Sequence, residues 1–172
     1  MTMTSPLQGR LAENRAQLRT VSVPPIETGL VATTVVLTGD GELPVEFLCE
    51  DDRILTRDAG MVRLKSLIRH EQTVDMVGIA AGSLGDMRPE TDLVLPVGQR
   101  ILIRDWRARA LRGTGQAMIR ADDLIDGEFV RALGPCRVIT HHLIFDRSHV
   151  IYAGGLELEA NPQLWPAQKL AA

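Results

Sequence analysis

Three histidines near the C-terminal end of the chain are the residues that most suggest metal chemistry. His141, His142 and His149 are close in sequence, and imidazole is a common ligand of zinc and other transition metals. Neighbouring residues of a strand face opposite sides, however, so His141 and His142 cannot both reach one ion without a bulge. We therefore expect no metal site, with His142 hydrogen-bonded inside the domain and His141 and His149 exposed.

A short acidic run offers a second kind of chemistry. Glu50, Asp51 and Asp52 could act as a general acid and base or as part of a calcium loop. An aspartate in a turn more often accepts backbone N–H bonds and fixes the loop. We predict this structural role for Asp52.

Five arginines in one stretch could bind an anion or an acidic partner. They are Arg100, Arg104, Arg107, Arg109 and Arg112. Arginines that alternate with apolar residues along a strand usually form a solvated face, and we favour this interpretation. An acidic protein partner stays open as the alternative.

The composition excludes several classes of function. Hydrophobic residues make up 45% and charged residues 24% of the 172 residues, as in an ordinary globular domain. The formal net charge is −3 and aromatic residues are only 3%, so we expect no nucleic-acid partner. No apolar stretch of about 18 residues could span a bilayer, and the first residues lack the apolar run of a secretory signal. We expect no membrane association and a cytoplasmic location, with leaderless export left open.

The two cysteines, Cys49 and Cys136, lie far apart and have no metal-like spacing. Two cysteines are too few for a disulfide framework, so we expect free, buried thiols.

The chain divides into three parts. Residues 1–25 are expected to form an arm, with leucines at roughly helical spacing over 1–20 that predict a short helix or a disordered segment. Pro24 and Pro25 exclude helix and indicate an extended linker. A single domain is expected over residues 26–160, followed by a tail at 161–172.

Within the domain, the apolar and β-branched segments are short and separated by turn signals, which is typical of an all-β fold. We predict strands at 33–37, 53–57, 61–67, 74–81, 92–95, 100–104, 108–112, 137–145 and 149–153. The last two are expected to pair as a hairpin. The charged run 121–126, which ends before Gly127, predicts a short helical turn.

Several of these segments carry a longer pattern. The first reads TVVLTGDGELPVEFLCEDDRILTRD over 34–58, and the others read DLVLPVGQRIL over 92–102, ADDLIDG over 121–127 and HLIFDRS over 142–148. Together they resemble the Hedgehog/intein (Hint) superfamily, in the form found in bacterial proteins with a stand-alone or C-terminal module. The resemblance covers about residues 26–160. It implies a flattened, β-barrel-like domain of two similar halves, 33–82 and 92–155, related by a pseudo-twofold axis.

The resemblance also implies a chemistry that this chain cannot perform in the usual way. A Hint domain converts its first peptide bond into a thioester, with a Cys thiol as nucleophile and a side chain that protonates the leaving amide. Here Gly29 replaces the Cys, Thr33 a Gly, Pro96 a Thr or Ser, and Gln99 the catalytic His, while His142 matches the family's closing His. Gln cannot transfer a proton near neutral pH.

We therefore expect a catalytically inactive Hint domain, retained as a binding or structural module, with no cofactor and an unidentified protein partner. Splicing also needs a C-terminal His-Asn pair, whereas Asn161 is followed here by Pro162. Two alternatives stay open. One is self-cleavage with Thr28 or Thr33 as nucleophile, and the other is a binding protein that resembles the family by chance.

Overall fold

The computed structural model describes residues 24–162, and the regular structure in this range consists mostly of antiparallel strands. One sheet has the order β1 (Leu30–Val31), β10 (Val130–Ile144), β6 (Ser66–Ile79) and β7 (Leu93–Pro96). The second runs through β3 (Gly41–Pro44), β2 (Val35–Thr38), β4 (Arg53–Thr56), β11 (His149–Ala153), β12 (Leu156–Ala160), β8 (Arg100–Ile103) and β9 (Ala117–Arg120), with β5 (Gly60–Arg63) paired to β4. The expected all-β architecture is thus confirmed, whereas the expected helix over 1–20 and most of the expected tail lie outside the described residues.

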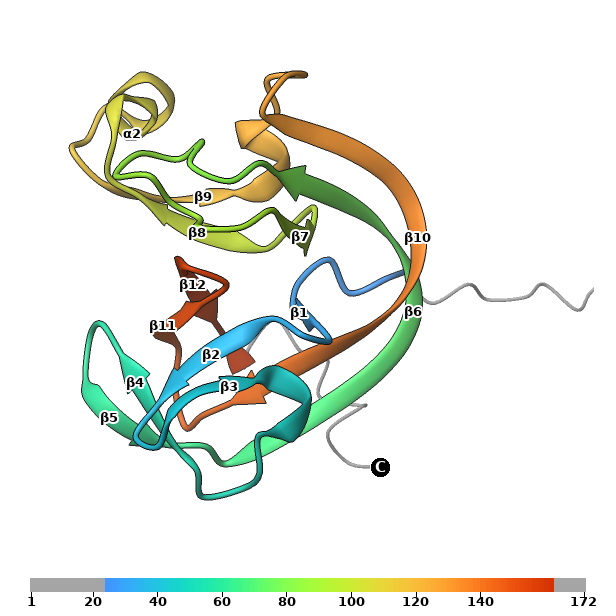
Figure 1. The fold of residues 1–172 in the computed structure, drawn as a ribbon, viewed down its shortest axis with the longest axis vertical. Coiled ribbons are helices and arrows are strands. Elements are labelled where there is room, and N and C mark those ends of the chain that lie inside the picture. The colour runs from blue at the N-terminus through green and yellow to red at the C-terminus, as the bar shows by residue number, and fades with distance from the viewer. Residues whose placement is uncertain (1–23, 163–172) are drawn as a thin grey trace, which may run out of the picture.

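The long strands β6 and β10 form a curved ribbon that connects two lobes (Figure 1). They pair antiparallel from Val130 opposite Ile79 to Ile144 opposite Ser66, with one irregularity between Ala132 and Gly134. The lower lobe of Figure 1 holds β2 to β5, and the upper lobe holds β7 to β9. The two halves are interleaved rather than separate, because β11 of the second half pairs with β2 and β4 of the first.

Two hairpin turns in the lobe that holds β2 to β5 are closed by the same hydrogen-bonding pattern of a threonine hydroxyl. In the sequence, both turns begin with Leu-Thr-x-Asp and continue to a glycine. Thr38 Oγ1 donates to the Gly41 carbonyl (2.7 Å) and accepts from the Asp40 N–H (3.1 Å). Thr56 Oγ1 donates to the Gly60 carbonyl (2.7 Å) and accepts from the Ala59 N–H (3.0 Å). Both threonines are buried although the turn residues beside them are exposed, so each hydroxyl satisfies backbone groups on the inner side of its turn.

One continuous core joins the two lobes. Its largest fully buried side chains include Phe145, Ile54, Leu64, Leu95 and Ile101, which come from both lobes and from the strands between them. Burial of such side chains contributes about 1.5–3 kcal/mol each relative to an exposed position. The lobes are therefore held by shared packing as well as by the β6–β10 ribbon.

The prediction of a strand at 108–112 is wrong, since this segment lies in helix α2 (Trp106–Arg112). The Asp105 carboxylate caps it by accepting the Arg107 N–H at 2.9 Å, and Gly113 ends it in the left-handed conformation (φ 72°). The predicted helical turn at 121–126 is confirmed as the 3-10 helix η2 (Ala121–Leu124), and a second one, η1, covers Val45–Phe47. Within residues 24–162, no helix is both long and apolar enough to cross a membrane.

The prediction of a final hairpin between 137–145 and 149–153 is also wrong. These segments are strands, but β10 pairs with β6 and β1, while β11 pairs with β12. Strand β12 was not predicted, and it takes the place beside β11 that we expected the segment 137–145 to fill.

Candidate functional site

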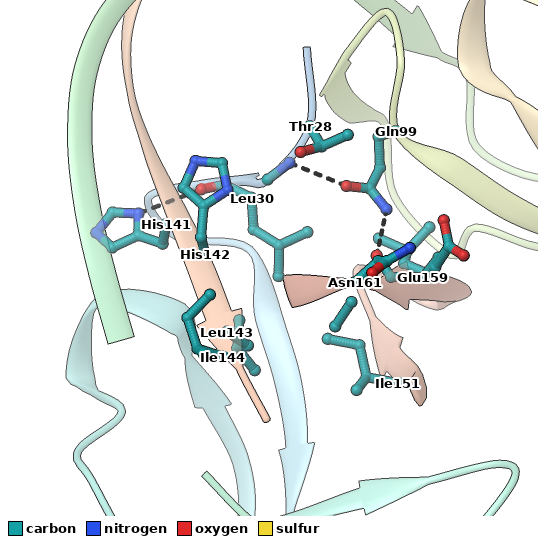
Figure 2. Close-up of a pocket in the computed structure, with 13 residues that line it drawn as sticks. Thr28, Leu30, Gln99, His141, His142, Leu143, Ile144, Ile151, Glu159 and Asn161 are labelled. Carbon is teal, nitrogen blue, oxygen red and sulfur yellow. Dashed lines mark hydrogen bonds between the residues drawn. The ribbon is translucent and has the colours of Figure 1, made fainter. Parts of the chain in front are cut away.

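The two residues that the resemblance places at the nucleophile and acid positions lie in direct contact. Gly29 immediately precedes β1, and Gln99 lies in the tight turn between β7 and β8. The Gly29 N–H donates a hydrogen bond to Gln99 Oε1 at 2.9 Å (Figure 2). Two positions that are 70 residues apart in sequence thus meet through one buried hydrogen bond.

The Gln99 side chain is fixed in this orientation by its other partners. Its Nε2 donates to the carbonyls of Arg100 (3.1 Å) and Glu159 (2.8 Å), and the residue is only 2% exposed. A flipped amide would place the NH2 group against the Gly29 N–H and the oxygen against two carbonyls, which is unfavourable on every contact. Gln99 therefore presents an acceptor, not a donor, to the amide nitrogen of residue 29.

Gly29 has no room for a side chain. Its φ of +113° lies in the region that side chains rarely adopt. A Cβ built here would lie 2.8 Å from His142 Cε1 and 3.2 Å from the His141 carbonyl oxygen. The His142 imidazole, whose Nε2 is 3.0 Å from Thr140 Oγ1, thus occupies the space in which a side chain at position 29 would begin.

The segment that leads into Gly29 is held by contacts that sequence reasoning missed. Gln72 on β6 bonds the Ile26 backbone twice, accepting from its N–H (2.8 Å) and donating to its carbonyl (2.7 Å). The Gly98 N–H donates to the Glu27 carbonyl at 2.8 Å, and a Cβ on Gly98 would lie 2.8 Å from Glu27 Cβ. Gly98 is therefore required for the close approach that aligns Gln99 with Gly29. In the sequence, the only sign of this close approach is the isolated glycine at position 98.

A small cavity of about 30 Å³ lies beside these residues. Thr28, Gly29, Gln99 and His142 line it, together with Asn161, whose side chain lies near Glu159 in Figure 2. A volume of this size holds about one water molecule but no substrate. The pocket is closed rather than prepared for a ligand.

Thr33 and Pro96 do not line this cavity. Thr33 is exposed in a left-handed turn (φ 71°), where its N–H donates to Glu46 Oε2 at 2.8 Å, and it lines a different cavity of about 440 Å³. Pro96 is buried at the end of β7, and its carbonyl accepts the Gln99 N–H at 3.1 Å, so it contributes only a backbone group to the turn. Of the five positions named from the resemblance, Gly29, Gln99 and His142 therefore line the cavity, and Thr33 and Pro96 do not.

The histidines are placed differently from our expectation as well. His142 is hydrogen-bonded within the domain as predicted, but His141 and His149 are buried, not exposed. His141 donates from Nδ1 to the Leu30 carbonyl (3.2 Å), and His149 Nδ1 contacts Asp58 Oδ2 at 2.9 Å. Among residues 24–162, no three His, Cys, Asp or Glu side chains are grouped to hold a metal ion.

The pair of Asp58 and His149 gives a prediction for stability. Burial opposes ionisation of Asp58, but hydrogen bonds from the Val150 N–H and from His149 outweigh it and lower the pKa of this carboxyl. A carboxyl with a lowered pKa in the folded state stabilises that state above its unfolded value of about 3.9, and the stabilisation is lost as the pH falls through the folded pKa. We expect Asp58→Asn to unfold at lower urea than the wild type near neutral pH, with the gap closing towards pH 3. A gap that stays constant with pH would show that Asp58 acts only through packing.

The other residues considered from the sequence have structural positions. Asp52 accepts the Cys49 N–H at 2.8 Å, which confirms its role in a turn. Both cysteines are free, but Cys49 is exposed and Cys136 half-buried, so the expected burial is wrong. Four of the five arginines form ion pairs with acids of the same chain: Arg100, Arg104, Arg107 and Arg112.

The fold is that of an all-β domain with two antiparallel sheets, in which the β6–β10 ribbon connects two lobes. The family model described as "Hint domain" matches residues 28–163, and the chain therefore belongs to the Hint domain family. A search of curated proteins finds no match to the sequence.

Solved inteins share the fold at low identity. The MchDnaB-1 intein is 13% identical, with 77% of this chain and 99% of that chain covered and a TM-score of 0.50. A bacterial intein-like domain from Clostridium thermocellum is 11% identical over 78% of this chain and 98% of its own, also with a TM-score of 0.50. Similarity at this level concerns the fold alone.

Proposed function

We propose that this protein is a Hint domain that does not cleave itself and that serves as a binding or structural module. The observation that carries the proposal is the buried hydrogen bond from the Gly29 N–H to Gln99 Oε1. Self-cleavage before residue 29 must protonate the Gly29 nitrogen. Gln99 places a hydrogen-bond acceptor at this nitrogen, where the reaction needs a proton donor.

Cleavage between Thr28 and Gly29 would need two groups. The first is a nucleophile at position 29, which glycine lacks. The second is an acid that gives a proton to the leaving nitrogen, since an amide anion is a very poor leaving group. Gln99 accepts at that nitrogen, and its two N–H groups are engaged by the carbonyls of Arg100 and Glu159. Neither half of the reaction has a residue to perform it.

The alternative of a threonine nucleophile receives little support from the geometry. Thr28 lines the small cavity, but an alcohol needs an adjacent base to become a useful nucleophile. Thr33 lies outside the cavity, in a turn held by Glu46. The intact-mass experiment below also tests this alternative, because cleavage by either hydroxyl would shorten the chain.

A use in binding or structure is supported by how well the site is packed. The positions that would hold the active site are occupied by the hydrogen-bonded amide of Gln99, the packed imidazole of His142, and Gly29, which lies in close contact with that imidazole. This arrangement stabilises the fold without providing chemistry.

We expect the purified full chain to keep its intact mass during days at neutral pH, with or without dithiothreitol. No thioester can form at Gly29, so a thiol has nothing to attack. Intact-mass spectrometry measures this directly, and an active intein incubated in parallel shows that the conditions support cleavage. A thiol-independent product cut before residue 28 or before residue 33 would instead indicate Thr28 or Thr33 as a hydroxyl nucleophile.

A further inference from the structure

A buried carboxylate between the lobes is surrounded by three arginines. Glu157 on β12 is 3% exposed, and its Oε1 accepts from Arg57 Nη1 and Arg104 Nη2, both at 3.0 Å. Arg88 Nη1 lies 3.9 Å from the same oxygen. The three guanidinium groups therefore converge on one point of the structure, and we call this group the arginine cluster.

The members of the arginine cluster come from separate parts of the chain. Arg57 follows β4, Arg88 lies between β6 and β7, and Arg104 follows β8. None of them lines the cavity beside Gly29. The cluster is thus assembled by the fold at a place that the Hint chemistry does not use.

The charges of the cluster do not balance. Three guanidinium groups surround one carboxylate, so two positive charges have no counterpart within the cluster. In water the repulsion between the guanidinium groups would be weak. Near the low-dielectric interior of the protein the same repulsion is stronger. An added anion at this point would relieve the repulsion among the arginines.

The hydrogen bonds of the cluster are also incomplete. A guanidinium has five N–H donors, yet Arg57 and Arg104 each donate once to Glu157, and Arg88 forms only the longer ion pair. The buried donor Arg88 Nε has no hydrogen-bond partner among the described residues. Buried polar atoms normally find a partner, in protein, water or ligand.

The side chains of the arginines are nevertheless accessible. Arg57 is 33%, Arg88 26% and Arg104 35% exposed, so unused donors can reach a molecule from solution. The hydrogen bonds to Glu157 hold two of the three guanidinium groups, those of Arg57 and Arg104, in place. Prepositioned donors with a net positive charge are what an oxyanion site requires.

We propose that Arg57, Arg88 and Arg104 bind a phosphate group, with Glu157 positioning the arginines. Phosphate fits better than a carboxylate because it carries close to two negative charges near neutral pH and three acceptor oxygens, which can engage several guanidinium groups at once. The proposal is independent of whether the domain cleaves itself.

The test is calorimetric titration of the full chain with inorganic phosphate, at an ionic strength held constant with sodium chloride. Parallel titrations use glycerol phosphate, to distinguish a phosphomonoester from free phosphate, and acetate, to test a simple carboxylate. We expect saturable binding of at least one phosphate compound and at least tenfold weaker binding of acetate. Binding no stronger than that of acetate overturns the proposal.

Arg88→Gln is the decisive variant, because Arg88 makes no short bond to Glu157 and its loss leaves both 3.0 Å contacts intact. We expect at least tenfold weaker phosphate binding with an unchanged circular dichroism spectrum. Arg137→Gln is the matched control, since it removes the same charge from an exposed pair with Glu71. Equal phosphate affinity in both variants would show that the arginine cluster is not the site.

Discussion

Replacing Glu157 by glutamine is expected to lower the free energy of unfolding by about 3 kcal/mol, as when one partner of a buried ion pair is removed. The carboxylate is buried and neutralises part of the charge on Arg57, Arg88 and Arg104. Without it, three guanidinium groups repel one another at the junction of the two lobes. Urea unfolding followed by circular dichroism measures the change.

The control for this variant is Glu71→Gln, which removes the same charge from an exposed pair with Arg137 on the β6–β10 ribbon. Exposed pairs contribute roughly 0–1 kcal/mol, so this variant should unfold almost like the wild type. If both variants behave alike, the buried carboxylate does not support the junction. Phosphate should partly restore the stability of Glu157→Gln if the arginine cluster binds it.

A methyl group at position 29 is expected to have the second large effect. Gly29→Ala forces a left-handed backbone on a residue with a side chain, which costs roughly 1–3 kcal/mol, and it also places a Cβ 2.8 Å from His142. Gly41→Ala is a matched control, because Gly41 has a similar φ of +101° but nothing within 4 Å of its Cβ position. Thermal unfolding of the two variants separates backbone strain from crowding.

The same crowding bears on any attempt to restore self-cleavage. Gly29→Cys with Gln99→His supplies a thiol and an acid, but the thiol must enter space that His142 occupies, and the buried contacts of Gln99 are lost. We expect no thiol-dependent cleavage from this double variant. Cleavage before residue 29 would show that the backbone geometry of the reaction survives and that only the side chains were lost. Equal stability of Gly29→Ala and Gly41→Ala would likewise argue against a closed site.

Elements of the fold could be predicted from the sequence where the residues that determine them lie close together in the chain. The strand at 53–57 and the helical turn at 121–126 were identifiable because their causes lie within a few residues. Helix α2 was also locally encoded, by Asp105 as its cap, by Ala, Leu and Arg in its body and by Gly113 at its end, but it was misread as a strand. That error arose from weighting apolar alternation above the capping residues.

Burial was harder to predict because it depends on distant partners. His141 is covered through contact with Leu30, and His149 pairs with Asp58, so neither environment is visible near the histidines themselves. Glu157 lies in an alternating Leu-Glu-Leu-Glu segment that suggests an exposed carboxylate, yet β12 lies between β11 and β8 with the arginines around it.

The resemblance to the family pointed to Gly29, Gln99 and His142 as site positions. The structure brings these three residues together. It did not show the polarity of the Gln99 amide or the role of Gly98, because both depend on three-dimensional contacts with Glu159 and Glu27. Thr33 and Pro96 were named from the resemblance alone, and neither lines the cavity beside Gly29.

The cavity beside Gly29 is lined by both Thr28, where the chain enters the domain, and Asn161, where it leaves (Figure 2). A domain with adjoining ends can be inserted into a surface loop of another protein without pulling the two sides of that loop apart. Under the function proposed above, the domain could therefore be grafted into a host loop as a spacer that keeps both host segments attached at one point.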